Sequence, residues 1–145
     1  VHRARLVRAA ERTGELWGPL RAWALKIVIG DDEQVAALNR QFRGIDAPTD
    51  VLSFPADTPQ LDPDEPDYLG DLVIAFPYAA AQAQREGHAL MDSLSLLVVH
   101  GTLHLLGYDH HSAEARQAMW AAQDAALLAL GLSPALVPAL EFGGH

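Results

Sequence analysis

Three histidines lie close together in the segment V-V-H-G-T-L-H-L-L-G-Y-D-H-H, residues 98–111. His100 and His104 are four residues apart, so on a helix their imidazoles project from the same face. Gly107 predicts the end of that helix, because glycine adopts the left-handed conformation at little cost. The chain can then turn back and bring His110 to the same point. Three imidazoles in this arrangement would hold a zinc ion and leave a fourth position open for water.

Two histidines at this spacing in an apolar helix, taken alone, are more often hydrogen-bonded core residues than metal ligands. The glycine and the third histidine reverse that preference, because H-x-x-x-H-x-x-G-x-x-H is the skeleton of the metzincin protease motif. One position differs: metzincins carry a glutamate directly after the first histidine as the general base, and this chain has Gly101. The pattern therefore favours a metal site and disfavours peptide hydrolysis.

Neighbouring polar residues admit other interpretations. His111 is the alternative third ligand, but the spacing of His110 matches the motif. Asp109 either orients a ligating imidazole or caps the following helix. His88, in a predicted loop, is interpreted as a solvated surface residue. The predicted ligand set is therefore His100, His104 and His110.

Charge is distributed unevenly along the chain. The net charge is −9, yet residues 1–43 hold eight of the ten Lys and Arg residues against five acids. The remainder, residues 44–145, holds two basic residues against fourteen acids. One face could therefore meet a polyanion while the rest of the surface repels it. The alternative, which charge alone favours, is an ordinary solvated helix with scattered arginines.

Composition also limits the cellular setting. The chain has no cysteine, which excludes disulfides and thiolate metal sites and is compatible with the cytoplasm. No apolar run approaches the roughly 18 residues that span a bilayer. The arginine-rich segment 1–18 lacks the apolar core of a secretory signal, and Glu11 and Glu15 argue against a transit peptide. We predict a cytoplasmic protein that does not associate with membranes.

Apolar periodicity and turn signals predict an α+β fold. We expect helices at residues 3–16 and 77–85 and at about 90–106 and 112–130. A further helix is capped by Asp31 or Asp32 and ends at Arg43-Gly44. We expect strands at 22–29, 51–54 and 68–76, and an acidic, proline-rich loop at 57–67. These elements do not alternate regularly, which favours a small mixed sheet of three or four strands packed with helices. Residues 1–145 fit one domain, with the metal site on a central helix and the loop after it, as in zincins.

Three segments resemble the YbeY endoribonuclease family of bacterial rRNA maturation factors. They are L-N-R-Q-F-R-G-I-D-A-P-T-D-V-L-S-F-P (residues 38–55), L-G-D-L-V-I-A (69–75) and H-G-T-L-H-L-L-G-Y-D-H (100–110). Together with Q-A-Q-R-E-G-H (82–88), the similarity runs from about residue 38 to residue 130. Three motifs in the same order make a chance match very rare.

The resemblance implies a zinc-binding endoribonuclease that is specific for single-stranded RNA. It implies action on the small ribosomal subunit, in 16S rRNA 3′-end maturation and 30S quality control in the cytoplasm, with no DNA substrate. The family's metal histidines fall on His100, His104 and His110, and its functional arginine falls on Arg43. An arginine suits phosphate because it donates two parallel hydrogen bonds. Without the resemblance, Arg43 is more simply a cation at a helix C-terminus.

Two other functions stay open at this point. The sparse basic charge and the missing general base suit a non-catalytic ribosome assembly factor whose metal is structural. A zincin-type peptidase or amidase is less favoured because of Gly101.

Overall fold

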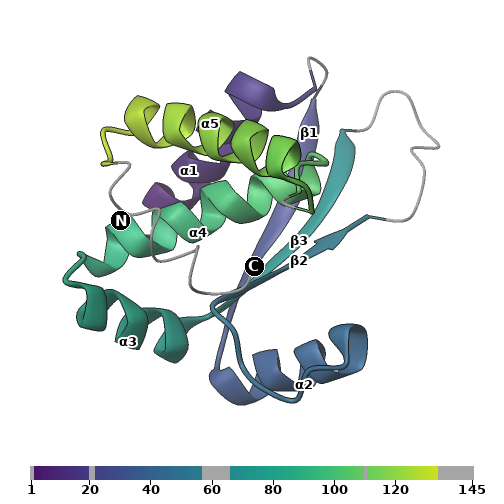
Figure 1. Ribbon diagram of the computed structural model, residues 1–145, viewed down its shortest axis with the longest axis vertical. Coiled ribbons are helices and arrows are strands. Elements are labelled where there is room, and N and C mark those ends of the chain that lie inside the picture. Colours follow the sequence, from purple (N-terminus) through teal and green to yellow (C-terminus); the bar gives the residue numbers. More distant parts are fainter. Residues whose placement is uncertain (1, 20–21, 57–65, 110, 134–145) are drawn as a thin grey trace.

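The computed structural model describes residues 2–19, 22–56, 66–109 and 111–133. Its elements, shown in Figure 1, follow the order α1 (His2–Trp17), β1 (Trp23–Gly30), α2 (Asp32–Arg43), β2 (Val51–Pro55), β3 (Asp67–Ala75), α3 (Phe76–Glu86), α4 (Leu90–Leu105) and α5 (Ala113–Ala129). Every predicted helix and strand is present, and no end differs from its prediction by more than one residue. Most of the predicted loop, residues 57–65, lies outside the described residues.

The three strands form one mixed sheet in the order β1-β3-β2. Strand β1 pairs with β3 in parallel, and β2 pairs with β3 antiparallel. The prediction of an α+β fold with a small mixed sheet is therefore confirmed. Strand β3 lies in the centre, and β2 forms one edge.

Strand β3 is buried on both faces, and this burial creates two packed layers. Side chains alternate across a strand. Leu72 and Ile74 accordingly join a core with α1, α4 and α5, whereas Val73 and Ala75 join a smaller core with α2. In Figure 1, α2 lies on the opposite side of the sheet from α1, α4 and α5. The near-continuous apolar run of β3 is typical of a strand covered on both sides.

Helix α4 is the central helix of the larger layer. Most of its residues are buried, including His100, as expected of a helix that is apolar around its whole circumference. Its two buried hydroxyls are satisfied within the helix, because Ser95 donates to the Met91 carbonyl at 2.7 Å and Thr102 donates to the Val98 carbonyl at 2.7 Å. These two hydroxyls therefore lie in the core with their donors paired.

Helix α2 begins with a capping box. The Asp31 carboxylate accepts from the Gln34 backbone N–H at 2.8 Å, and the Gln34 side-chain oxygen accepts from the Asp31 N–H at 3.0 Å. Replacing Asp31 with alanine is expected to lower the free energy of unfolding by about 1 kcal/mol. Urea unfolding measures this change. Glu11→Ala, which removes an exposed carboxylate from α1, is the control, and an equal loss in both variants would contradict the capping role.

Candidate active site

His100 and His104 face each other near the end of α4. Their Nε2 atoms are 3.1 Å apart, and their ring planes lie at 82°. Two nitrogens bound to one zinc at tetrahedral geometry and 2.0–2.1 Å lie about 3.3 Å apart. The pair therefore fits a shared metal ion, with imidazole nitrogens as the donors.

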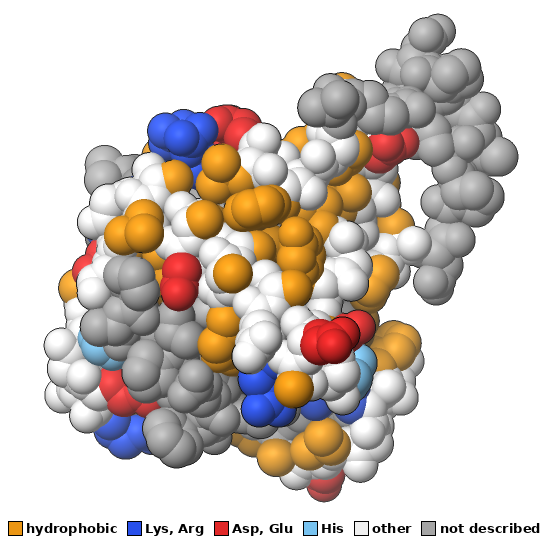
Figure 2. Space-filling view, turned by 45° about the horizontal axis from the view of Figure 1, so that its top comes forward, with side chains coloured by type: hydrophobic (Ala, Val, Ile, Leu, Met, Phe, Trp, Pro, Cys, Tyr) orange, Lys and Arg blue, Asp and Glu red, His pale blue; other side chains and the backbone are white. Residues whose placement is uncertain are grey.

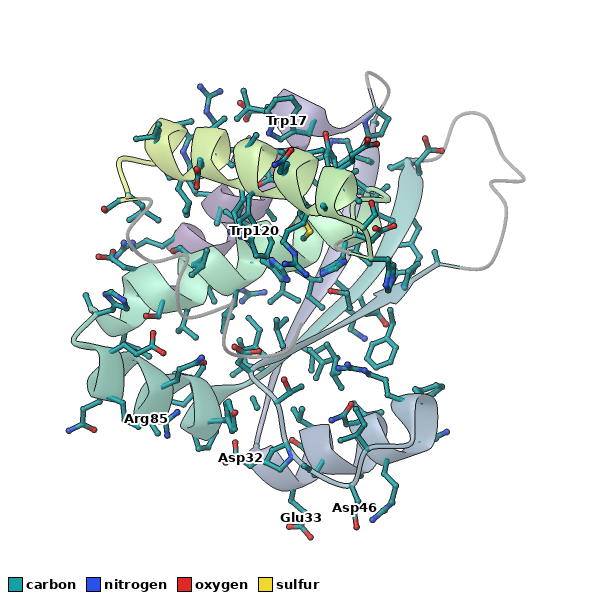
Figure 3. The ribbon with its side chains drawn as sticks, in the orientation of Figure 1. Trp17, Asp32, Glu33, Asp46, Arg85 and Trp120 are labelled. Carbon is teal, nitrogen blue, oxygen red and sulfur yellow. The ribbon has the colours of Figure 1, made fainter. Side chains whose placement is uncertain are left out.

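Helix α5 fixes the orientation of His100. The Gln123 side-chain oxygen lies 2.9 Å from His100 Nδ1, and both side chains are fully buried. An amide oxygen can only accept, so Nδ1 carries the proton and Nε2 presents its lone pair towards His104. Trp120, labelled in Figure 3, lies on α5 above α4. Its ring packs edge-on against the His100 ring, with ring centroids 5.8 Å apart. This tautomer is the one that leaves Nε2 able to bind a metal.

The chain reverses direction immediately after the histidine pair. Gly107 has a positive φ of 101°, and its N–H donates to the His104 carbonyl at 3.1 Å. Tyr108 N–H donates to the Leu103 carbonyl at 3.0 Å. These two bonds form a Schellman motif, the helix ending that glycine was predicted to provide.

The residues beyond this turn are described only in part. His110, the predicted third ligand, lies outside the described residues, so the complete ligand set stays a prediction. Within the described ranges, no group of three or more His, Cys, Asp or Glu residues is placed to hold a metal. The Asp109 carboxylate accepts from the His111 backbone N–H at 3.1 Å. It does not cap the following helix, because the N-cap of α5 is Ser112, whose hydroxyl accepts from the Ala115 N–H at 3.0 Å. His88 lies at the turn between α3 and α4, where its Nε2 is 3.9 Å from a Glu86 carboxylate oxygen.

A cleft of about 470 Å³ joins the histidine pair to the end of α2. It is lined by Phe42, Arg43, Val51, Leu52, Ser53, Phe54, Pro55, His100, His104, Gly107, Tyr108 and Asp109. Arg43 and the two histidines, which are far apart in the sequence, therefore share one cleft. Edge strand β2 forms the wall between them.

Sequence reasoning missed the aromatic wall of this cleft. Phe42 is 59 % exposed, and its ring packs edge-to-face against the Phe54 ring, with ring centroids 5.2 Å apart. The only sequence signal was that Phe42 precedes Arg43 within the family-like segment. Gln123 was also missed, because nothing in the sequence around a single glutamine in a helix indicates its hydrogen-bond partner.

Gly101 lies where α4 packs tightly against the sheet. A Cβ at this position would lie 2.7 Å from Leu72 Cδ2 and 3.2 Å from Ser53 Oγ. The Ser53 hydroxyl donates to the Gly101 carbonyl at 3.4 Å. The packing of helix on strand therefore explains why this position, occupied by glutamate in metzincins, is glycine in this chain.

Comparison with known proteins identifies the family of the chain. The sequence model described as endoribonuclease YbeY matches residues 4–131. The chain belongs to the YbeY family. A relative from Roseiflexus castenholzii named endoribonuclease YbeY is 47% identical over 133 residues, covering 89% of this chain and 82% of its own. Another from Moorella thermoacetica, with the same name, is 46% identical over 116 residues, covering 74% of this chain and 73% of its own.

The YbeY assignment confirms the predicted enzyme class, since the relatives are named as endoribonucleases, which are hydrolases of RNA. The fold agrees as well. The solution structure of a Thermotoga maritima protein superposes with a TM-score of 0.53 at 24% identity, covering 88% of this chain and 81% of its own. In the described part of the chain, every helix is too short or too polar to span a membrane.

Proposed function

We propose that this YbeY-family chain is a zinc-dependent endoribonuclease specific for single-stranded RNA. Its proposed role is 16S rRNA 3′-end maturation and quality control on the small ribosomal subunit, in the cytoplasm. The observation that carries the proposal is the shared cleft, in which Arg43 accompanies two imidazoles with Nε2 atoms 3.1 Å apart. Family membership supports the reaction class.

The proposed zinc ligands are His100, His104 and His110. Neutral imidazoles suit zinc, and the 3.1 Å separation of the first two supports a common ion. When bound, zinc lowers the pKa of a water ligand or polarises a phosphoryl oxygen. The remaining task, holding the scissile phosphate, is assigned to the Arg43 guanidinium, whose planar fork can donate two hydrogen bonds to phosphate oxygens.

The cleft suits a single strand better than a duplex. An exposed aromatic ring can stack on an unpaired base, whereas the faces of paired bases are covered by their neighbours. Phe42 offers such a ring directly beside Arg43. On the face shown in Figure 2, Lys and Arg side chains form small separate groups rather than one broad basic surface. We therefore infer that local contacts contribute more to binding than long-range attraction, with a shallow dependence of affinity on salt.

Phe42→Ala is expected to weaken the binding of a single-stranded RNA oligonucleotide roughly five- to 150-fold, because one base–aromatic stack contributes about 1–3 kcal/mol. Fluorescence anisotropy with a labelled oligonucleotide measures the dissociation constant. Phe76→Ala is the matched control, since Phe76 is also exposed but begins α3 and does not line this cleft. Equal affinity of Phe42→Ala and the native protein would refute the stacking role.

The decisive experiment incubates purified protein with rRNA and compares three proteins: native, His104→Ala and Arg43→Ala. The native protein should cut single-stranded regions. His104→Ala should lose cleavage, and Arg43→Ala should lose about 10²–10³-fold, as is usual when one donor to a developing charge is removed. Arg43→Lys should recover only part, because an ammonium cannot reproduce the bidentate contact. Equal cleavage by the native protein, His104→Ala and Arg43→Ala would indicate a contaminating nuclease and refute the assignment.

A second candidate function is a ribosome assembly factor with a structural metal. The complete burial of His100 favours it, because a metal bound to a core residue stabilises the fold whether or not it reacts. A metal-site variant that still folds, binds small subunits and supports rRNA maturation in cells would favour this function over catalysis.

A further inference from the structure

Gln123 is a fully buried polar side chain in α5 that approaches the histidine pair from behind the cleft. Its oxygen lies 2.9 Å from His100 Nδ1. Its amide nitrogen is buried and has no hydrogen-bond partner among the described residues. A buried donor without a partner is unfavourable. The glutamine therefore requires an explanation that packing does not supply, and the hydrogen bond that its side chain makes to the described residues is the one with His100.

The contact selects one of two forms of the imidazole. A neutral histidine carries its proton on either Nδ1 or Nε2, and only the nitrogen without the proton can bind a metal. The Gln123 oxygen, as an acceptor, stabilises the form with Nδ1–H. The Nε2 lone pair of His100 then points towards His104 Nε2, 3.1 Å away. Without this acceptor, the neutral ring could place its proton on the nitrogen that faces the cleft.

We propose that Gln123 is a positioning residue that holds His100 in the Nδ1–H tautomer and so prepares Nε2 for the metal. This inference rests on the proposed metal site. Ligating histidines commonly donate their second N–H to a carboxylate or a carbonyl oxygen, which fixes the ring and increases its basicity. Here the acceptor is a neutral amide. A carboxylate at the same position, in Gln123→Glu, is therefore expected to bind the metal at least as tightly as the native side chain.

A purely structural role makes a different prediction. Gln123→Met has similar length and removes both the acceptor and the unpaired amide nitrogen. The second loss offsets the first, so the midpoint of urea unfolding of the metal-free protein should change little. The zinc affinity of Gln123→Met should fall even though its stability without metal is nearly unchanged. If Gln123 only packed, Met would leave zinc binding unchanged.

The test measures zinc affinity by competition with a chromogenic chelator, in the absence of RNA. Gln123→Met should bind zinc about 10–100-fold more weakly, as is typical when the partner of a ligating histidine is lost. Gln123→Glu should match or exceed the native affinity. Gln117→Met, at an exposed position of the same helix, is the control and should bind as the native protein does. Native-like zinc affinity in Gln123→Met would overturn the proposal.

A second readout does not depend on zinc. Nitrogen-15 NMR of the metal-free protein reports which nitrogen of His100 carries the proton. The Nδ1–H form should dominate in the native protein and in Gln123→Glu, and a tautomer mixture should arise in Gln123→Met. A dominant Nε2–H form in the native protein, or no zinc binding by it, would refute the inference. Correct tautomers and zinc affinities in a protein that cuts no RNA would support the inference and refute the proposed nuclease function.

Discussion

Replacing Gly101 with glutamate is expected to destabilise the protein strongly rather than to create a peptidase. The substitution introduces the residue that metzincins use as general base, at the matching position of the motif. However, a Cβ at Gly101 would lie 2.7 Å from Leu72 Cδ2, and Leu72 is fully buried. The carboxylate would also enter a buried part of α4. Overpacking and an unpaired buried charge together are expected to exceed about 4 kcal/mol, a large part of the usual 5–15 kcal/mol of stability.

Two further variants separate these effects. Gly101→Ala adds only the crowded methyl group and is expected to lower the free energy of unfolding by about 1–3 kcal/mol, less the gain in helix propensity. Ala118→Glu adds the same charge at an exposed position of α5 and should change little. Urea unfolding and a fluorescent casein assay measure stability and peptidase activity. A Gly101→Glu protein that is as stable as the native protein, or that cleaves casein, would contradict the close packing of α4 against Leu72 of β3.

The elements were predictable because their ends carry strong local signals. Helix α2 is bounded by the Asp31 cap and by Gly44 at a positive φ of 72°, and both signals can be read from the sequence. Strand pairing could not be predicted, because apolar residues on β3 fit either neighbour in either direction. The order β1-β3-β2 depends on which helices cover each face of the sheet, and that is a property of the whole fold.

The candidate site was predictable to a different extent. The spacing of His100 and His104 along one helix fixed their convergence, because an i, i+4 pair needs no tertiary structure to share a face. Arg43 could be assigned to the site only from the family resemblance, because no local sequence pattern indicates that α2 lies near α4. Phe42 had only its position beside Arg43 as a signal, and Gln123 had none. Their roles depend on contacts between α2 and β2 and between α4 and α5.

Zinc is expected to stabilise the folded protein strongly, because unfolding moves the histidine ligands apart and releases the ion. At free zinc a thousandfold above the dissociation constant, the free energy of unfolding should rise by about 4 kcal/mol. For a chain of this size the melting temperature should rise by roughly 10 °C. Thermal unfolding followed by circular dichroism, after treatment with a chelator and again after zinc addition, measures the change.

His104→Ala and His88→Ala determine where that zinc binds. His104→Ala removes one of the two facing nitrogens while sparing the buried His100–Gln123 contact, so the zinc-induced rise should nearly vanish. His88→Ala removes a histidine from the distant turn between α3 and α4 and should keep the full rise. An equal rise in both variants would place the ion elsewhere. A zinc-induced stabilisation that requires His104 would place the metal at the C-terminal end of α4, because Gly107 ends this helix within one turn of His104. This end of α4 lines the same cleft as Arg43.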